Sequence, residues 1–209
     1  MPVSDRGWVY VKDSYISPNN GARYRPCVGI MLINKKGLVW IGRRCDLGKR
    51  KKSRFPLLWQ MPQGGIASGE EPVQAARREL FEETKISSCS FLAESGDWLS
   101  YDFPPGATGK RWRGKWIGQT QKWFAFSFDG DDREVVLDGG AGGRREFSAW
   151  RWEEARKLPE LVVNFKRPIY RKVIEEFHHL LQWEDSQDAG VVTPSLTTSP
   201  QDLTETTIP

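Results

Sequence analysis

Hydrophobic positions recur with two periods along the chain, and each period predicts its own type of element. Two apolar runs, residues 25–34 and 38–44, predict an early hairpin, with Gly37 supplying a permissive backbone for the turn. Further strands are expected at residues 59–62, 90–95, 97–103, 121–128 and 146–152. The segment 121–128 alternates most clearly, because its phenylalanines share one face and make that face strongly apolar.

Apolar residues at three- and four-residue spacing predict two helices. The first opens at Glu70, Glu71 and Pro72, since proline fits a first turn and acidic side chains suit the positive end of the helix dipole. Its expected buried stripe is Val73, Ala76, Leu80 and Thr84. The second helix begins near Pro168, with an apolar face of Tyr170, Val173, Ile174, Phe177 and Leu181. The order strands, helix, strands, helix indicates an α+β sandwich rather than a doubly wound sheet.

Three carboxylates, Glu79, Glu82 and Glu83, fall within five positions of the first predicted helix. Like charges at this spacing destabilise an isolated helix by roughly 0.2–0.5 kcal/mol per pair. At 100° per residue they lie beside the buried stripe, at the boundary of the core. Two explanations are compatible with this position: a solvated surface, or a site for hard divalent cations, which prefer oxygen ligands.

The charge of the chain is unevenly distributed. Residues 184–209 are rich in Thr, Ser and Pro, carry five acidic residues and have no Lys or Arg, which predicts a disordered acidic tail. Leaving these five charges out changes the formal charge from +4 for the whole chain to +9 for residues 1–183. A basic folded part favours partners that bear phosphate groups.

Cysteine and histidine are too few for a disulfide framework or a zinc site. Cys27, Cys45 and Cys89 are odd in number and form no C-x-x-C pair, and His178 and His179 have no companion ligands. No apolar run approaches the length of a membrane span, and the first 24 residues lack a signal-peptide core. We therefore expect a cytoplasmic protein without a membrane partner.

The glutamates belong to a longer motif. From Gly64, the sequence GGIASGEEPVQAARRELFEETKI fits G-x5-E-x7-R-E-U-x-E-E-x-G-U, where U is bulky and aliphatic, at eight of nine fixed positions over 23 residues. The matches are Gly64, Glu70, Arg78, Glu79, Leu80, Glu82, Glu83 and Ile86. This segment resembles the Nudix box, the signature of hydrolases that act on nucleoside diphosphates linked to another group. Lys85 departs from the pattern, since the family usually has glycine there and glycine readily ends a helix.

The resemblance implies a Nudix-type α/β/α sandwich with a mixed β-sheet and a catalytic loop and helix. It also implies that Glu79, Glu82 and Glu83 coordinate several divalent ions, Mg²⁺ or Mn²⁺. Glu70 and Arg78 are expected to support the loop and the helix through charge-assisted hydrogen bonds. Gly64 and Gly65 are expected to permit a tight loop after the strand WQMP, where the backbone approaches the helix.

Similarity extends over roughly residues 24–183 and points to one branch of the family. The segments YRPCVGIML, WQMPQGG, WLSYDFPP, GQTQKWFAF, EFSAWRW and VVNFKRPIY resemble bacterial RNA pyrophosphohydrolases and plant-type diadenosine tetraphosphate hydrolases. In that branch the carboxylate before the Phe of EFSAWRW helps to bind metal or to position water, which implies the same role for Glu146.

The same branch implies a set of substrate-binding residues. Arg25 and Tyr101 would contact phosphates, whereas Arg44 and Phe165 would hold a base with Lys166 nearby. Core packing is the alternative for Tyr101 and for Phe165. Lys122 is placed either to reach phosphate or to face solvent.

Two basic clusters suit a polyphosphate or single-stranded RNA, although a solvated loop explains either one equally well. They are Lys49, Arg50, Lys51, Lys52 and Arg54 in the expected loop 45–58, and Lys110, Arg111, Arg113 and Lys115 with Trp112 and Trp116 in the expected loop 104–118.

The chain is thus divided into an N-terminal extension (1–23), a Nudix hydrolase domain (24–183) and the tail (184–209). The expected function is a metal-dependent pyrophosphohydrolase acting on (di)nucleoside polyphosphates such as diadenosine tetraphosphate, on triphosphorylated 5′ ends of RNA, or on both. The alternative is a catalytically silent Nudix-like module that binds RNA or regulates another protein. The intact set of glutamates favours the enzyme, because a module that only binds has no need for crowded carboxylates facing an anionic ligand.

Overall fold

The computed structural model describes residues 9–10, 14–17, 21–45, 59–104, 115–138 and 145–181. Its strands are β1 (Val9–Tyr10), β2 (Tyr15–Ile16), β3 (Arg23–Ile33), β4 (Val39–Arg44), β5 (Trp59–Gln60), β6 (Gln63–Gly65), β7 (Cys89–Glu94), β8 (Leu99–Asp102), β9 (Gly118–Phe128) and β10 (Phe147–Glu153). The α-helices are α1 (Pro72–Thr84), α2 (Leu158–Leu161) and α3 (Arg167–Phe177), with 3-10 helices η3 (Asp132–Glu134), η5 (Ala155–Lys157), η6 (Asn164–Lys166) and η7 (His178–Leu180). The tail and the first basic cluster lie outside the described residues.

The two longest strands, β3 and β9, form the parallel centre of the sheet. Their register runs from Tyr24 opposite Gly118 to Ile33 opposite Ser127. Antiparallel neighbours complete the sheet, with β7 and β8 along β9, β6 and β2 along β3, and β10 and β5 along β4. The sheet is therefore mixed.

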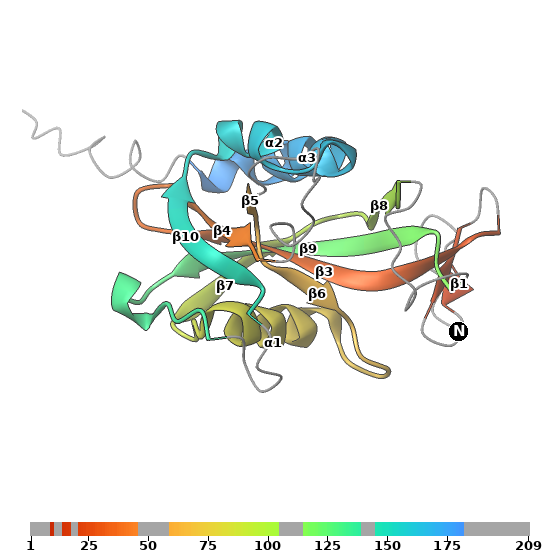
Figure 1. Ribbon diagram of the computed structural model, residues 1–209, viewed down its shortest axis with the longest axis horizontal. Helices are drawn as coiled ribbons and strands as arrows, with labels where there is room; N and C mark the ends of the chain where they lie inside the picture. Colours follow the sequence, from red (N-terminus) through yellow and green to blue (C-terminus); the bar gives the residue numbers. More distant parts are fainter. Residues whose placement is uncertain are drawn as a thin grey trace, which may run out of the picture.

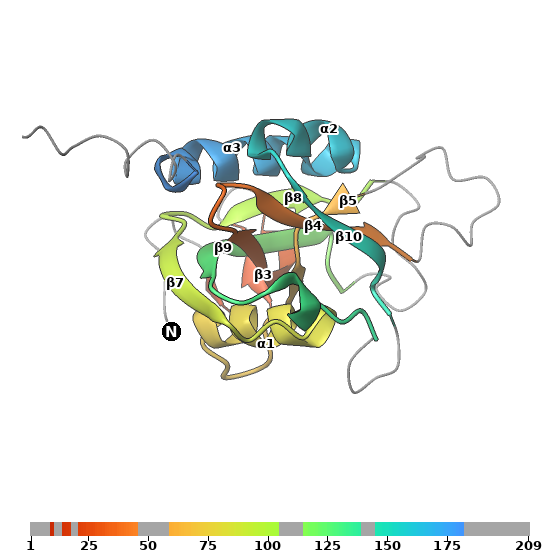
Figure 2. The same ribbon diagram turned by 90° about the vertical axis from the view of Figure 1, so that its left-hand side faces the viewer.

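Alternate residues of this central pair enter two separate cores, which makes the fold a sandwich. Ile30 and Phe124 pack with the buried face of α1, whereas Met31 and Trp123 pack with α2 and α3. Figures 1 and 2 show α1 on one face of the sheet and α2 with α3 on the opposite face. The predicted α+β sandwich of the Nudix type is confirmed.

The predicted hairpin is present but short, and the strand predicted to have one apolar face is covered on both faces. The turn of the predicted hairpin is present, with Gly37 at a φ of 69°. Beyond the pair Ile33–Val39, however, β3 continues along β9 and β4 along β10, so the two predicted partners separate. The segment 121–128 was expected to have one strongly apolar face, but both of its faces are covered because β9 lies at the centre of the sheet.

Helix α1 ends where the family motif has its glycine. Ala76, Leu80 and Thr84 are buried as predicted, whereas Val73 is half-buried and Ala75 joins the buried face. Lys85 then adopts the left-handed conformation with φ 64° and donates its backbone N–H to the carbonyl of Phe81 at 2.8 Å. Its ammonium lies 3.3 Å from Asp138 and 5.2 Å from the ring centroid of Phe81. The motif position is thus kept in geometry although its residue has changed.

We predict that Lys85→Gly stabilises the protein by up to about 1 kcal/mol, because a left-handed non-glycine residue costs roughly 1–2 kcal/mol and the exposed ion pair that is lost contributes little. Lys85→Ala is the matched control, since it removes the same contacts and keeps the strained backbone. Urea denaturation of the three proteins measures the difference. A glycine variant no more stable than the alanine variant contradicts the argument.

Candidate active site

The guanidinium of Arg78 joins α1 to the segment that precedes it. It donates to both carboxylate oxygens of Glu70, at 2.7 and 2.9 Å, and to the carbonyl of Gly65 at 2.9 Å. It also contacts Glu79 at 2.9 Å and Glu82 at 3.3 Å. Arg78 and Glu82 are four positions apart, a spacing at which side chains of one helix meet. The hydrogen bonds from Arg78 lower the pKa of Glu70. These contacts give a physical basis for the supporting role expected of Glu70 and Arg78.

Gly64 and Gly65 lie in strand β6, which corrects the expectation of a tight loop, and neither has a positive φ. Their importance is steric. A Cβ atom on Gly64 would overlap the carboxylate of Glu79, and one on Gly65 would overlap the guanidinium of Arg25. The two glycines therefore bring an acidic and a basic side chain against the backbone of one strand.

The carboxylate of Glu83 lies deepest in the glutamate group. Burial, followed by the nearby charges of Glu146 and Glu79, raises the pKa of Glu83 well above its usual value. The backbone N–H of Gln63 donates to it at 3.3 Å. Burial is also the main cause of the raised pKa of Glu79. Ionised carboxylates in this position repel one another, so the site is suited to a counterion.

Glu146 reaches the same region from the other side. It lies at the start of β10, and its side chain forms an ion pair with Arg44 at 3.0 Å. Its influence on the pKa of Glu83 places the two carboxylates near each other although they are 63 positions apart in the chain. Glu82 is more accessible, with half of its side chain exposed.

The oxygen donors of this group suit a hard divalent cation. Within the described ranges, no three acidic, His or Cys side chains already form a ligand set for one ion. The carboxylates of Glu79, Glu82 and Glu146 instead pair with arginines, while Glu83 remains under repulsion. Coordination of Mg²⁺ or Mn²⁺ by these residues therefore requires their side chains to turn away from the arginines.

A second, cationic group faces the carboxylates. Lys166 at the end of η6 is buried, and its ammonium donates to Gln63 at 2.8 Å and to Gln60 at 3.3 Å. Burial, together with the charge of Arg44, lowers the pKa of Lys166 to about 7. Arg44 at the end of β4 donates to the same oxygen of Gln60 at 3.2 Å. Two of the three predicted substrate-binding cations, Arg44 and Lys166, are thus brought together by one glutamine.

The two aromatic residues expected to bind substrate contact each other. The ring centroids of Tyr101 and Phe165 are 5.4 Å apart, and the ammonium of Lys166 lies 5.7 Å from the Tyr101 ring. Tyr101 is only 8% exposed and belongs to the core on the α3 side, where its hydroxyl donates to Gln119 at 2.5 Å. Most of the Tyr101 ring therefore packs in the core, which was the alternative to phosphate binding. Phe165 is partly buried against the same core.

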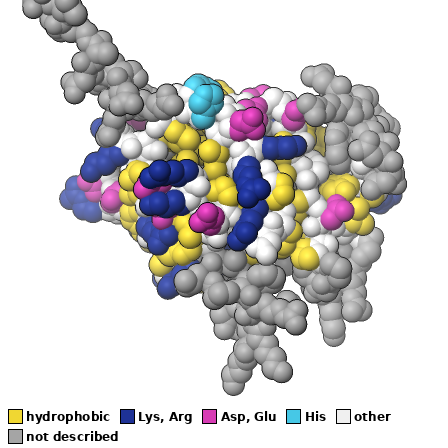
Figure 3. Space-filling model, turned by 90° about the horizontal axis from the view of Figure 1, so that it is seen from above, with side chains coloured by type: hydrophobic (Ala, Val, Ile, Leu, Met, Phe, Trp, Pro, Cys, Tyr) yellow, Lys and Arg dark blue, Asp and Glu magenta, His cyan; other side chains and the backbone are white. Residues whose placement is uncertain are grey.

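Lys122 does not face the carboxylate group. Its ammonium lies 3.4 Å from Glu94 and bonds the carbonyl of Ser95, at the end of β7. In the second basic cluster the described residues are Lys115 and Trp116, with the ammonium 4.2 Å from the ring centroid. Figure 3 shows further Lys and Arg side chains in several groups on the face that carries α2 and α3.

Sequence reasoning did not identify the glutamines that line this site. Gln60, Gln63 and Gln121 are linked through Lys166 and through a 3.4 Å contact between the last two side chains. The available signal was the polar alternation within WQMPQGG and GQTQKWF, where glutamines interrupt segments that are otherwise apolar and central. A polar residue in a buried strand requires a partner, and here that partner is a buried ammonium.

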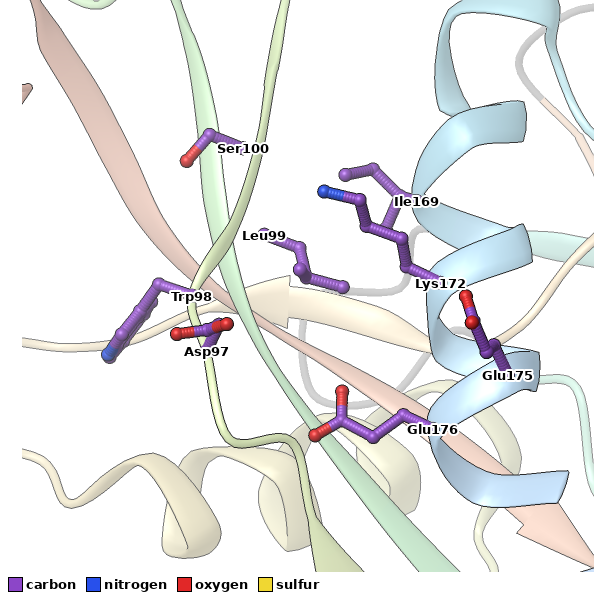
Figure 4. A pocket seen from close by; sticks show the side chains of 8 residues that line it. All are labelled: Asp97, Trp98, Leu99, Ser100, Ile169, Lys172, Glu175 and Glu176. Atoms are coloured by element: carbon purple, nitrogen blue, oxygen red, sulfur yellow. The ribbon is translucent and has the colours of Figure 1, made fainter. Parts of the chain in front are cut away.

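A separate pocket of about 500 Å³ lies between β8 and α3, and none of the glutamates of α1 lines it. Figure 4 shows its lining, which includes Trp98, Leu99, Ser100, Ile169, Lys172 and Glu176. None of the predicted site residues lines this pocket. The pocket is therefore distinct from the group formed by Glu79, Glu82, Glu83 and Glu146.

The α/β/α sandwich places the glutamates of α1 beside the cationic side chains of Arg44 and Lys166, which is the arrangement expected of a Nudix hydrolase. Comparison with known proteins agrees, because the model of the NUDIX domain matches residues 23–173. The chain belongs to the Nudix family. Two similar curated proteins are each called RNA pyrophosphohydrolase: that of Brucella anthropi is 52% identical over 76% of this chain and 91% of its own, and that of Agrobacterium fabrum is 52% identical over 75% of this chain and 93% of its own.

A solved structure gives the same result for the fold. The Nudix hydrolase RenU of M. smegmatis superposes with a TM-score of 0.52 at 18% identity, covering 83% of this chain and 96% of that protein. At this identity the likeness concerns the fold alone.

We predict that Glu83→Gln raises the thermal stability of the metal-free protein at pH 8. A carboxyl whose pKa is raised by folding destabilises the folded state when ionised, and this penalty disappears as the pH falls toward the usual carboxyl value of 4.5. The gain in Tm should therefore be at least about 2 °C at pH 8 and should vanish near pH 4.5. Calorimetry in EDTA measures both values.

Glu160→Gln on α2 is the control, because Glu160 is exposed and α2 lies on the opposite face of the sheet from α1. A gain for Glu83→Gln that is the same at both pH values contradicts the assignment of a buried, repelled carboxylate.

Proposed function

We propose that this protein is a metal-dependent pyrophosphohydrolase that removes pyrophosphate from the triphosphorylated 5′ end of RNA. The observation that carries the proposal is the opposition of two groups, the carboxylates of α1 and β10 and the cations of β4 and η6, bridged by the ion pair between Glu146 and Arg44. The names of relatives at 52% identity over nine tenths of their length support RNA as the substrate.

The metal requirement follows from the same carboxylates. We assign Mg²⁺ or Mn²⁺ to Glu79, Glu82 and Glu83, with Glu146 assisting. When bound, such ions polarise phosphate oxygens and promote ionisation of water. Among the protein's own groups, Glu83 and Glu146 are the candidates for accepting the proton of the attacking water. Burial raises the pKa of Glu83, which makes its carboxylate a better base near neutral pH.

The cationic group binds the other half of the substrate. Arg25, held against Gly65, and the buried Lys166 supply positive charge for phosphate oxygens, where they offset negative charge that develops during cleavage. Arg44 and Phe165 hold the base, because guanidinium and aromatic faces stack on bases irrespective of their identity. The Tyr101 ring supports Phe165 from the core.

RNA 5′ ends and free nucleotides are cytoplasmic substrates, and we infer a cytoplasmic location. The three cysteines are free, in agreement with a reducing compartment. In the part of the chain that the structure describes, no helix is long and apolar enough to cross a membrane.

We predict that Glu82→Gln and Glu83→Gln each lower Mg²⁺-dependent release of pyrophosphate at least about 100-fold, since each removes a metal-binding charge. Glu160→Gln should leave the rate unchanged. The measurement is pyrophosphate release from triphosphorylated RNA with Mg²⁺ and with EDTA. If both glutamine variants retain full turnover, the metal assignment is wrong.

The same assay tests the alternative function. An unmodified protein that binds triphosphorylated RNA but releases no phosphate from RNA or from diadenosine tetraphosphate, with Mg²⁺ or with Mn²⁺, is the silent binding module rather than the enzyme.

We predict that kcat/KM for triphosphorylated RNA exceeds that for diadenosine tetraphosphate by at least about tenfold, because the basic folded part, +9 over residues 1–183, favours the longer anion. Parallel assays of both substrates at one salt concentration measure the ratio. A preference of that size for the dinucleotide makes the protein a dinucleoside polyphosphate hydrolase instead.

A further inference from the structure

Gln60 lies between two of the predicted substrate-binding cations, Arg44 and Lys166. It lies in β5 and is only 3% exposed. Its side-chain oxygen accepts hydrogen bonds from the guanidinium of Arg44 at 3.2 Å and from the ammonium of Lys166 at 3.3 Å. The orientation of the amide is fixed by chemistry, because the reverse orientation would place its NH₂ group against two cations.

The side-chain NH₂ group of the same amide does not stabilise the fold. Nε2 of Gln60 is buried without a hydrogen-bond partner among the described residues. A buried donor that is left unpaired destabilises the folded state, and an apolar side chain of similar shape would avoid that cost. Packing therefore does not explain a glutamine at this position, whereas its contacts with the two cations do.

The two cations, Arg44 and Lys166, come from separate parts of the fold. Lys166 ends η6 and also donates to Gln63, at 2.8 Å. Arg44 ends β4 and is also paired with Glu146, at 3.0 Å. Long cationic side chains lose considerable rotamer freedom when they are fixed. Gln60 is the group that bonds both, so it sets the separation between their charged ends.

We propose that Gln60 is a positioning residue that holds Arg44 and Lys166 at the separation between a base and a phosphate of one bound nucleotide. The inference rests on the proposed function and goes further, because it assigns the alignment of base and phosphate to a residue that contacts neither. Gln60 thereby couples the base-binding and phosphate-binding parts of the site. Loss of the coupling weakens substrate binding in the ground state and the transition state alike, so it raises KM more than it lowers kcat.

Gln60→Met tests this role, because methionine has a similar length and shape but no acceptor for the two cations. With triphosphorylated RNA and Mg²⁺, we expect KM to rise about tenfold while kcat changes less than about threefold. The melting temperature should stay within about 3 °C of the unmodified protein, since the lost acceptor is accompanied by removal of the unpaired donor. Gln74→Met, at an exposed position of α1, is the matched control and should change neither constant.

A double-mutant cycle separates positioning from an independent effect. If Gln60 acts through Lys166, the loss in kcat/KM for Gln60→Met with Lys166→Met will be clearly smaller than the product of the two single losses. Multiplicative losses, an unchanged KM in Gln60→Met, or a loss confined to kcat each overturn the proposal.

Gln60→Asn provides a second variant in case methionine is not accommodated, since its shorter amide cannot reach both cations. If both variants lower the melting temperature by more than about 5 °C, Gln60 is structural and the proposal fails. Failure of the proposed function looks different, because the unmodified protein itself then shows no Mg²⁺-dependent release.

Discussion

The hydrogen bonds of one guanidinium hold together the parts on which the site depends. Arg78 connects Glu70 before the helix, the carbonyl of Gly65 in β6, and two glutamates of α1. A single cation therefore offsets part of the repulsion among the carboxylates of α1, at Glu79 and Glu82, before any ligand binds. Its bonds to Glu70 and to the carbonyl of Gly65 also tie the helix to the segment that precedes it. Without Arg78, the glutamates would be free to separate in the way that isolated like charges do.

The opposing cations show the complementary arrangement, in which charge is buried against neutral oxygens. The ammonium of Lys166 donates hydrogen bonds to the side-chain oxygens of Gln60 and Gln63, and burial lowers its pKa to about 7. Two groups of opposite sign are thus held in reach of each other and are joined directly at Glu146 and Arg44. Under the proposed function, a polyphosphate with bound divalent ions would satisfy both groups at once, because the ions would meet the carboxylates and the phosphate oxygens would meet the cations.

The sequence predicted the elements that have a strong period and the residues that carry a motif. The α1 and α3 patterns, the glutamates and the α+β class could be found because helical spacing and a long motif are local signals. The predicted hairpin of β3 and β4 is present but pairs only next to its turn, and the long parallel pairing of β3 with β9 could not be predicted because it leaves no mark in the neighbouring residues. The short helix α2 has too few residues to show a period. The role of Gln60 and Gln63 in the site could not be predicted, because their partner, Lys166, lies about 100 positions away in the sequence.

The register of β10 has a consequence for how this architecture varies between proteins. Its pairing with β4 shifts between Phe147 and Ala149, next to the backbone bond from Cys45 N–H to the carbonyl of Glu146 at 2.8 Å. Glu146 is therefore located by the strand it pairs with rather than by the connection that leads to it. We therefore expect an insertion or deletion in the connection that leads to Arg145 to leave the carboxylate in place, whereas a single residue gained or lost between Glu146 and the paired part of β10 would turn it to the opposite face. The position of this carboxylate thus depends on strand pairing and not on the length of the preceding connection.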